Sequence, residues 1–126
     1  MSQTSIKYKN SQGKFISKEE AKETEKYWKE MYENEHLVKA EVFYQQELMG
    51  LYHYRSDNRD HQSIMKAYLS SGYKWVCILE YENYPGYILE KRYSYNLNGV
   101  LTGINLALHD SKGELIAHGY KNAEGE

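Results

Sequence analysis

Five histidines and one cysteine are the side chains in this chain whose chemistry could be catalytic or metal-binding. No two histidines stand four residues apart beside a third ligand, so the spacing does not match a metal site. His53 and His61 flank the segment 55–60, so a metal or acid–base site there is conceivable, but the favoured interpretation is loop and strand-end histidines that face solvent. His109 and His118 could meet across the last hairpin as a cross-strand polar pair.

Cys77 has the sequence context of a core residue rather than a nucleophile. Its neighbours Val76 and Ile78 are apolar, whereas a nucleophilic cysteine needs a histidine and an accessible, electropositive setting. A single cysteine also excludes a disulfide framework within one chain, which suits a reducing compartment.

Acidic residues and glycines likewise form no catalytic motif. Glu80, Glu82 and Glu90 lie near one turn and could in principle form a glycosidase-like pair, although carboxylates in such positions are usually solvated. The chain lacks a serine-nucleophile elbow and a phosphate-binding loop, and Gly99 and Gly103 lack the strand-to-helix context of a dinucleotide fingerprint. We therefore predict no catalytic residue, no cofactor and no metal, and a protein that is not an enzyme.

The strongest signal in the sequence is a turn that occurs three times, in residues 10–16, 96–102 and 110–116. Each copy places Asn or Asp three residues before a glycine and then starts an apolar strand. Asn and Asp hydrogen-bond to their own turn, and glycine adopts positive φ without steric cost. The repeat predicts β-hairpins, so the chain should be largely a meander of antiparallel strands.

The elements predicted before residue 60 are a short hairpin, a long helix and a second hairpin. Ser17 and Glu20 match a capping box, which predicts a helix from Ser17 to about Asn34. Its apolar stripe would consist of Ala21, Thr24, Trp28, Met31 and Glu35, with Tyr27 and Tyr32 beside it. Strands are predicted at 6–8, 14–16, 37–44 and 48–54, and the link 45–47 lacks glycine, which predicts a loose hairpin.

The second half of the chain predicts a short helix and then four strands. The helix should run from about Arg59 to Leu69, with Ile64, Met65, Tyr68 and Leu69 as its apolar residues, and end near Gly72. The strand from Tyr73 to Tyr81 is apolar on both faces, as a central strand would be, with Tyr73, Trp75, Cys77, Leu79 and Tyr81 on one of them. Pro85 and Gly86 fit a type II turn, and strands should follow at 87–95, 100–109 and 115–120.

These elements predict one α+β domain over residues 1–126, a mostly antiparallel, Tyr-rich meander with two helices packed on it. The 14 tyrosines suit a half-buried sheet, and an exposed Tyr-rich surface would also suit partner binding. No apolar run is long enough to cross a membrane, and residues 1–4 lack the apolar core of a signal peptide, so we expect a cytoplasmic protein.

Charge is the most informative guide to a partner. The net charge of −2 gives no basic field for nucleic acid. Residues 17–47 contain nine Glu and five Lys, a net charge of −4. This pattern is typical of a solvated face, and it also suits an acidic surface that docks on a basic partner such as a nuclease.

The chain resembles the immunity proteins of bacterial polymorphic toxin and contact-dependent inhibition systems. The resemblance lies in the run Gly13-Lys14-Phe15-Ile16-Ser17-Lys18-Glu19-Glu20-Ala21, in Tyr27-Trp28 and in the Tyr-rich meander. It implies that the protein binds one cognate toxin domain in the producing cell and blocks its active site or another essential surface.

We therefore expect a protein-binding immunity protein, a monomer or weak dimer without nucleic-acid or membrane partners. Its predicted contacts are charged residues and tyrosines, namely Glu30, Glu33, Glu35, Arg55, Asp57, Arg59, Asp60, Tyr84 and Tyr87. One alternative is a small-ligand-binding or enzymatic domain with a pocket between helices and sheet, in which His53 or His61 is the working group. Another is an assembly module whose Tyr-rich sheet edge pairs with itself.

Overall fold

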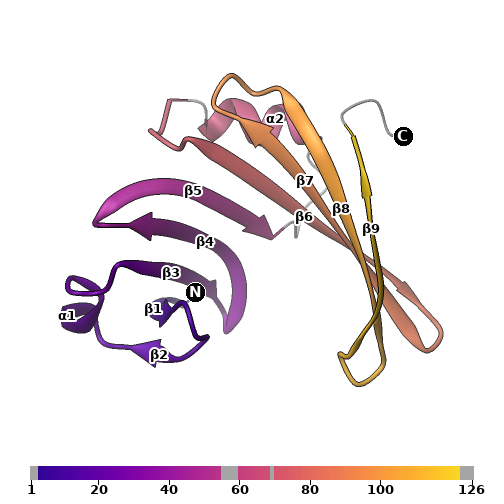
Figure 1. The fold of residues 1–126 in the computed structure, drawn as a ribbon, viewed down its shortest axis with the longest axis horizontal. Coiled ribbons are helices and arrows are strands. Elements are labelled where there is room, and N and C mark those ends of the chain that lie inside the picture. The colour runs from indigo at the N-terminus through magenta and orange to yellow at the C-terminus, as the bar shows by residue number, and fades with distance from the viewer. Residues whose placement is uncertain (1–2, 55–59, 69, 123–126) are drawn as a thin grey trace.

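Nine strands form one continuous twisted sheet in the computed structural model, which describes residues 3–54, 60–68 and 70–122 (Figure 1). The strands are β1 (Thr4–Asn10), β2 (Phe15–Ile16), β3 (Lys26–Glu33), β4 (His36–Tyr44), β5 (Glu47–Tyr54), β6 (Trp75–Tyr84), β7 (Tyr87–Asn96), β8 (Leu101–Asp110) and β9 (Leu115–Lys121). Their order in the sheet is β2-β1-β3-β4-β5-β6-β7-β8-β9. All neighbouring pairs are antiparallel except β5 and β6, so the prediction of a mostly antiparallel sheet with helices is confirmed.

The parallel pair β5–β6 exists because helix α2 (His61–Tyr68) connects the two strands across one face of the sheet. The helix buries Ile64 and Met65 in a core cluster with Leu51, Val76 and Ile78. A helix with this apolar pair was predicted here, and it is confirmed over the described residues. The central position of β6 is confirmed too, because residues 76–79 are buried on both faces of the sheet.

The long helix predicted from Ser17 to about Asn34 is wrong. Helix α1 (Lys18–Ala21) is a single turn that has the predicted capping box, with bonds of 3.0 and 3.1 Å between Ser17 and Glu20. The chain then forms β3, which pairs with β1 on one side and β4 on the other. Aromatic residues favour strands. Strands β1 and β4 also supply backbone hydrogen bonds on both sides, and the spacing of residues within one segment does not reveal such partners.

The loose hairpin predicted at 45–47 is also wrong. Tyr44 pairs with Glu47, so the turn has two residues, Gln45 and Gln46, with φ of 51° and 65°. Two successive positive φ values define the tight turn that suits the twist of a hairpin. The Gln46 side chain donates a hydrogen bond to the backbone oxygen of Ala21 at 3.0 Å, and this tertiary contact supports a conformation that glutamine rarely adopts.

The repeated turn is confirmed in all three copies, which have the same hydrogen bonds. In the copy that joins β7 and β8, the side-chain oxygen of Asn96 accepts from the backbone N–H groups of Asn98 and Val100, at 2.9 and 3.1 Å. Gly99 has φ of 79° and donates to the Asn96 carbonyl at 2.9 Å. Equivalent bonds hold the turns that start at Asn10 and Asp110.

Replacing Asn96 with alanine should lower the free energy of unfolding by about 1–2 kcal/mol, because two backbone donors lose their acceptor. Urea unfolding measures the change. Asn98→Ala in the same turn is the matched control, because the exposed Asn98 side chain makes none of these bonds. Equal losses for the two variants would show that the Asn96 side chain does not stabilise the turn.

The two faces of the sheet differ in what covers them. One carries α2 and the core cluster, and the other, the open face, has no described helix over the central strands. Trp75, Cys77 and Leu79 point to the open face as predicted. The prediction for Tyr73 is wrong, because Tyr73 lies before β6 and packs against the α2 cluster, where its hydroxyl donates to Glu41 at 2.7 Å.

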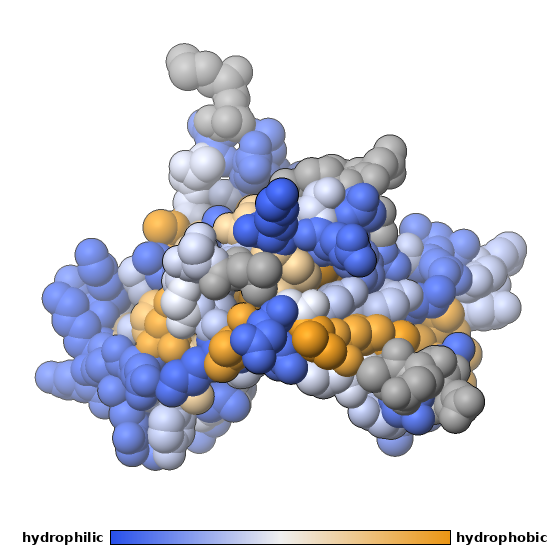
Figure 2. All heavy atoms as spheres, turned by 90° about the horizontal axis from the view of Figure 1, so that it is seen from above, coloured by the Kyte–Doolittle hydropathy of each residue, from blue (hydrophilic) through white to orange (hydrophobic). Residues whose placement is uncertain are grey.

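Seen from above, the surface is mostly hydrophilic, and hydrophobic residues show in small separate areas rather than in one broad patch (Figure 2). Neither described helix has the length or the apolar run that crossing a bilayer would need.

Candidate functional site

A groove crosses the open face, and its floor consists of small side chains. Ala40 pairs with Tyr52, Tyr52 with Cys77, Cys77 with Ser94, and Ser94 with Gly103. Residues paired in register point to the same face of a sheet, so this row crosses β4 to β8 on one side. Apart from Tyr52 every member is small, which leaves depressions over Ala40 and over Cys77 and Ser94, whereas the Tyr120 ring fills the space over Gly103.

Larger side chains flank the floor on both sides. On one side the register runs from Trp28 through Val42 and Gly50 to Trp75. On the other side Tyr54 pairs with Leu79, and Leu79 pairs with Arg92. The groove therefore has aromatic residues on both walls and an arginine on one.

Trp75 is held in place by the glycine opposite it. A Cβ atom added to Gly50 would lie 2.2 Å from two ring atoms of Trp75, so the indole lies directly against the Gly50 backbone. The Tyr52 ring meets Trp75 edge-on, with centroids 5.2 Å apart. Gly50 thus provides the space that fixes one aromatic wall of the groove.

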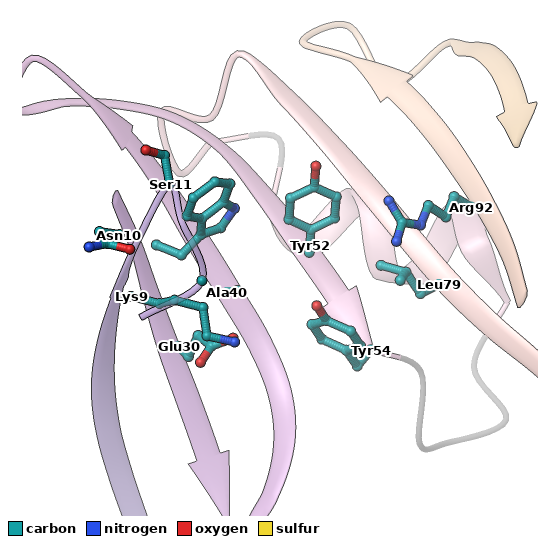
Figure 3. Close-up of a pocket in the computed structure, with 11 residues that line it drawn as sticks. Lys9, Asn10, Ser11, Glu30, Ala40, Tyr52, Tyr54, Leu79 and Arg92 are labelled. Atoms are coloured by element: carbon teal, nitrogen blue, oxygen red, sulfur yellow. The ribbon is translucent and has the colours of Figure 1, made fainter. Parts of the chain in front are cut away.

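The groove deepens into two adjoining pockets. The larger has a volume of roughly 290 Å³ and is lined by residues that include Lys9, Trp28, Glu30, Tyr52, Tyr54 and Arg92 (Figure 3). The second, of roughly 250 Å³, continues past Tyr52 and Arg92 to Trp75 and Asn105. Figure 3 shows the Arg92 guanidinium reaching from β7 toward Tyr52, and the Lys9 ammonium beside Glu30.

Two buried carboxylates lie beneath the charged groups of this face. Glu30 accepts a hydrogen bond from the Tyr32 hydroxyl at 2.9 Å and lies 3.4 Å from the Lys9 ammonium. Glu90 bonds the Nε of Arg92, and the His109 ring lies 3.5 Å from it. Buried carboxylates need such partners, and in return they orient the cations above them.

Burial raises the pKa of tyrosines that line the groove or contact its buried Glu30. It raises the pKa of Tyr52 and of Tyr54, while the positive charge of Arg92 opposes the shift in both. Burial, followed by the hydrogen bond to Glu30, raises the pKa of Tyr32 to about 12. These hydroxyls therefore stay protonated near neutral pH and can donate hydrogen bonds.

Cys77 should be unreactive in the folded protein. It is buried, and desolvation raises the pKa of its thiol to about 11, so below that pH the nucleophilic thiolate is scarce. At pH 7.5 we expect modification by a disulfide reagent to be at least about tenfold slower in the native protein than in urea. Absorbance of the released thiol measures both rates. Equal rates would mean that Cys77 is accessible in the groove floor.

The structure separates the three glutamates that the sequence analysis grouped. Glu30 is buried on the open face, whereas Glu33 ends β3 and Glu35 lies in the following turn, both exposed. Glu35 and Asn34 have φ of 67° and 52°, which makes this turn another tight hairpin. Of these three glutamates, only Glu33 and Glu35 therefore expose their carboxylates to a partner.

The remaining predicted contacts lie on other elements. Tyr84 and Tyr87 stack at the β6–β7 turn with ring centroids 5.2 Å apart, and both are exposed. Gly86 there has φ of 85°, as the predicted type II turn requires. Asp60 is exposed and accepts a hydrogen bond from the Ser63 backbone N–H at 2.7 Å at the start of α2. Arg55, Asp57 and Arg59 lie outside the described residues.

His53 and His61 lie on the α2 side of the sheet, away from the groove. A His53 ring nitrogen is 2.8 Å from the Tyr68 hydroxyl. His61 lies between Glu80 and the Tyr95 hydroxyl, each 2.8 Å from a ring nitrogen. Within the described parts of the chain, no three His, Cys, Asp or Glu residues come together as a metal site would need.

The sequence analysis did not identify Trp28 as a groove residue because it assigned residues 17–34 to a helix, whereas Trp28 lies in strand β3. Two signals in the sequence could have pointed to the other groove residues. Tyr52 and Tyr54 lie two apart in a predicted strand and therefore share a face, and Arg92 lies within another predicted strand.

Comparison with protein-family models, with curated proteins and with solved structures finds no match to this chain.

Proposed function

We propose that this chain is a bacterial, cytoplasmic immunity protein that neutralises a cognate toxin domain by forming a complex with it. The observation that carries the proposal is the groove on the open face, where Tyr52 and Arg92 line both pockets, Trp28 lines the first and Trp75 lines the second. Trp, Tyr and Arg supply most of the energy in protein interfaces. A wide, open sheet face lets a partner domain reach all of them together.

Two exposed hairpin ends could extend the contact. The turn after β3 carries Glu33 and Glu35, which would meet basic residues of the partner, and a nuclease is a partner of that kind. The β6–β7 turn carries the stacked pair Tyr84 and Tyr87, which would supply an aromatic anchor. Glu30 acts indirectly in this scheme, because it is buried and holds Lys9.

Co-purification with the C-terminal domain encoded by the gene immediately upstream tests the proposal. We expect a tight complex whose affinity falls as salt rises, since exposed charges are screened. The double variant Glu33→Lys/Glu35→Lys should weaken binding at low salt by roughly tenfold. Glu114→Lys, an exposed change at the β8–β9 turn, is the matched control. Failure to co-purify at any salt concentration would contradict the proposal.

A second candidate is self-association through β9. All seven residues of this strand are exposed, it forms one edge of the sheet, and its large apolar residues include Leu115 and Ile116. An exposed apolar edge strand can pair with another copy. Sedimentation over a range of concentrations separates the two candidates, because a dimer that Ile116→Lys abolishes would favour assembly.

A further inference from the structure

We propose that the larger groove pocket binds a carboxylate, supplied by an acidic side chain of the partner protein. This inference rests on the proposed immunity function and names the chemistry that the groove recognises. It begins from the two ion pairs that border the pocket, Lys9–Glu30 and Arg92–Glu90.

In both pairs the cation is more exposed than the anion. The side chains of Lys9 and Arg92 are 31% and 47% exposed, whereas those of Glu30 and Glu90 are 7% and 10% exposed. A partner that enters the pocket therefore meets positive charge first. The carboxylates beneath hold the two cations in place, so less conformational freedom is lost when a ligand binds.

Arg92 still has donors to offer. Its Nε bonds Glu90, and among the described residues no hydrogen bond uses its two Nη nitrogens. An arginine recognises a carboxylate best through two parallel N–H donors. The guanidinium points toward Tyr52 within the pocket, so a bound carboxylate would lie between them (Figure 3).

Tyr52 and Tyr54 supply further donors. Within the described parts of the chain neither hydroxyl makes a hydrogen bond, and both side chains line the same pocket as Arg92. A protonated phenol donates one hydrogen bond, and a carboxylate has several lone pairs to accept it. Glu30 also lines the pocket, but its carboxylate already accepts a hydrogen bond from the Tyr32 hydroxyl and pairs with Lys9, so the hydrogens that the pocket offers to a ligand come from Arg92, Tyr52 and Tyr54.

The size of the pocket favours a side chain over a larger ligand. Its volume of roughly 290 Å³ is at the lower limit for drug-sized ligands, and its mouth opens into the longer groove. A partner could thus dock along the groove and insert one Asp or Glu.

Tryptophan fluorescence gives a direct test, because the only two tryptophans of the chain, Trp28 and Trp75, both line the groove. Succinate is the carboxylate probe, inorganic phosphate is the competing anion, and sodium chloride matches the ionic strength. We expect succinate to change the emission saturably and more strongly than chloride does. A response equal to that of chloride would overturn the inference, and tighter binding of phosphate would assign the pocket to a phosphate ligand instead.

Variants connect the response to the named donors. Arg92→Gln should weaken succinate binding roughly tenfold or more, and Arg92→Lys should retain part of it. If Arg92→Gln does not fold because Glu90 loses its partner, Tyr52→Phe/Tyr54→Phe removes two donors, keeps both rings and should weaken binding several-fold. Lys112→Gln, exposed at the β8–β9 turn, should change nothing. Unchanged affinity in both the arginine and the tyrosine variants would overturn the inference.

Co-purification separates this inference from the proposed function. A complex with the upstream domain that Arg92→Gln and Tyr52→Phe/Tyr54→Phe leave intact would overturn the carboxylate site and keep the immunity function. Saturable succinate binding without any complex would overturn the immunity function and, with it, the assignment of the carboxylate to a toxin. Weakening of the complex by succinate in the native protein, but not in the tyrosine variant, would support both.

Discussion

Replacing Gly50 with alanine is expected to destabilise the protein by about 1–3 kcal/mol and to displace an aromatic wall of the groove. The new Cβ would lie 2.2 Å from the Trp75 ring, closer than real Cβ contacts come, so the indole must move. Urea unfolding measures the loss of stability. The emission of Trp75 in the folded variant should shift as the ring leaves its place against the backbone.

Gly119→Ala is the matched control, because Gly119 is also a strand glycine and a Cβ there would meet nothing within 4 Å. That variant should be as stable as the parent or slightly more stable, since alanine restricts the unfolded chain. If Gly50→Ala is as harmless as Gly119→Ala, Trp75 does not lie against Gly50. Adding Trp75→Leu to Gly50→Ala should recover part of the loss, because the smaller side chain leaves room for the methyl group.

Ile64→Ala should lower the free energy of unfolding by about 2–5 kcal/mol, the range seen when a large aliphatic side chain is truncated in a core. Ile64 is fully buried between α2 and the sheet, where it belongs to the cluster of Leu51 and Ile78. Its loss leaves a cavity under the crossover that makes β5 and β6 parallel neighbours. Chemical denaturation measures the effect.

Lys66→Ala on the exposed side of the same helix should change stability by less than about 0.5 kcal/mol. Because α2 and the groove lie on opposite faces of the sheet, folded Ile64→Ala should bind succinate with the affinity of the parent. A small loss of stability in Ile64→Ala would mean that the helix is not docked on the sheet as described. Loss of succinate binding in the folded variant would mean that the two faces are coupled.

Burial of Glu30 changes how the acidic segment 17–47 can act. Glu30, Glu33 and Glu35 were expected to share one acidic surface at the end of a helix over residues 17–34, but β3 turns Glu30 inward and leaves Glu33 and Glu35 outside. The same strand places Trp28 in the groove wall. In this fold, acidic and aromatic contacts therefore lie on different surfaces, and variants can test them separately.

Local sequence signals were sufficient wherever one short segment contains the whole interaction. The three Asn/Asp–Gly turns, the Ser17–Glu20 capping box and the Pro85–Gly86 turn were all predicted from residues within five positions of each other. The apolar pair Ile64 and Met65 likewise marked α2 before any contact was known. In each case the atoms that form the bonds, or the face that is buried, are neighbours in the chain.

Tertiary structure alone decided the rest. A helix at 17–34 satisfied the spacing of the apolar residues, but pairing with β1 and β4 on both sides made residues 26–33 a strand. The groove likewise depends on the register between strands, which sets Tyr52 beside Cys77, and Gly50 beneath Trp75. The sequence thus determined the turns, most strands and the α+β class by itself, whereas the candidate site arose from contacts between distant segments, because register is set by the whole sheet and by no single strand.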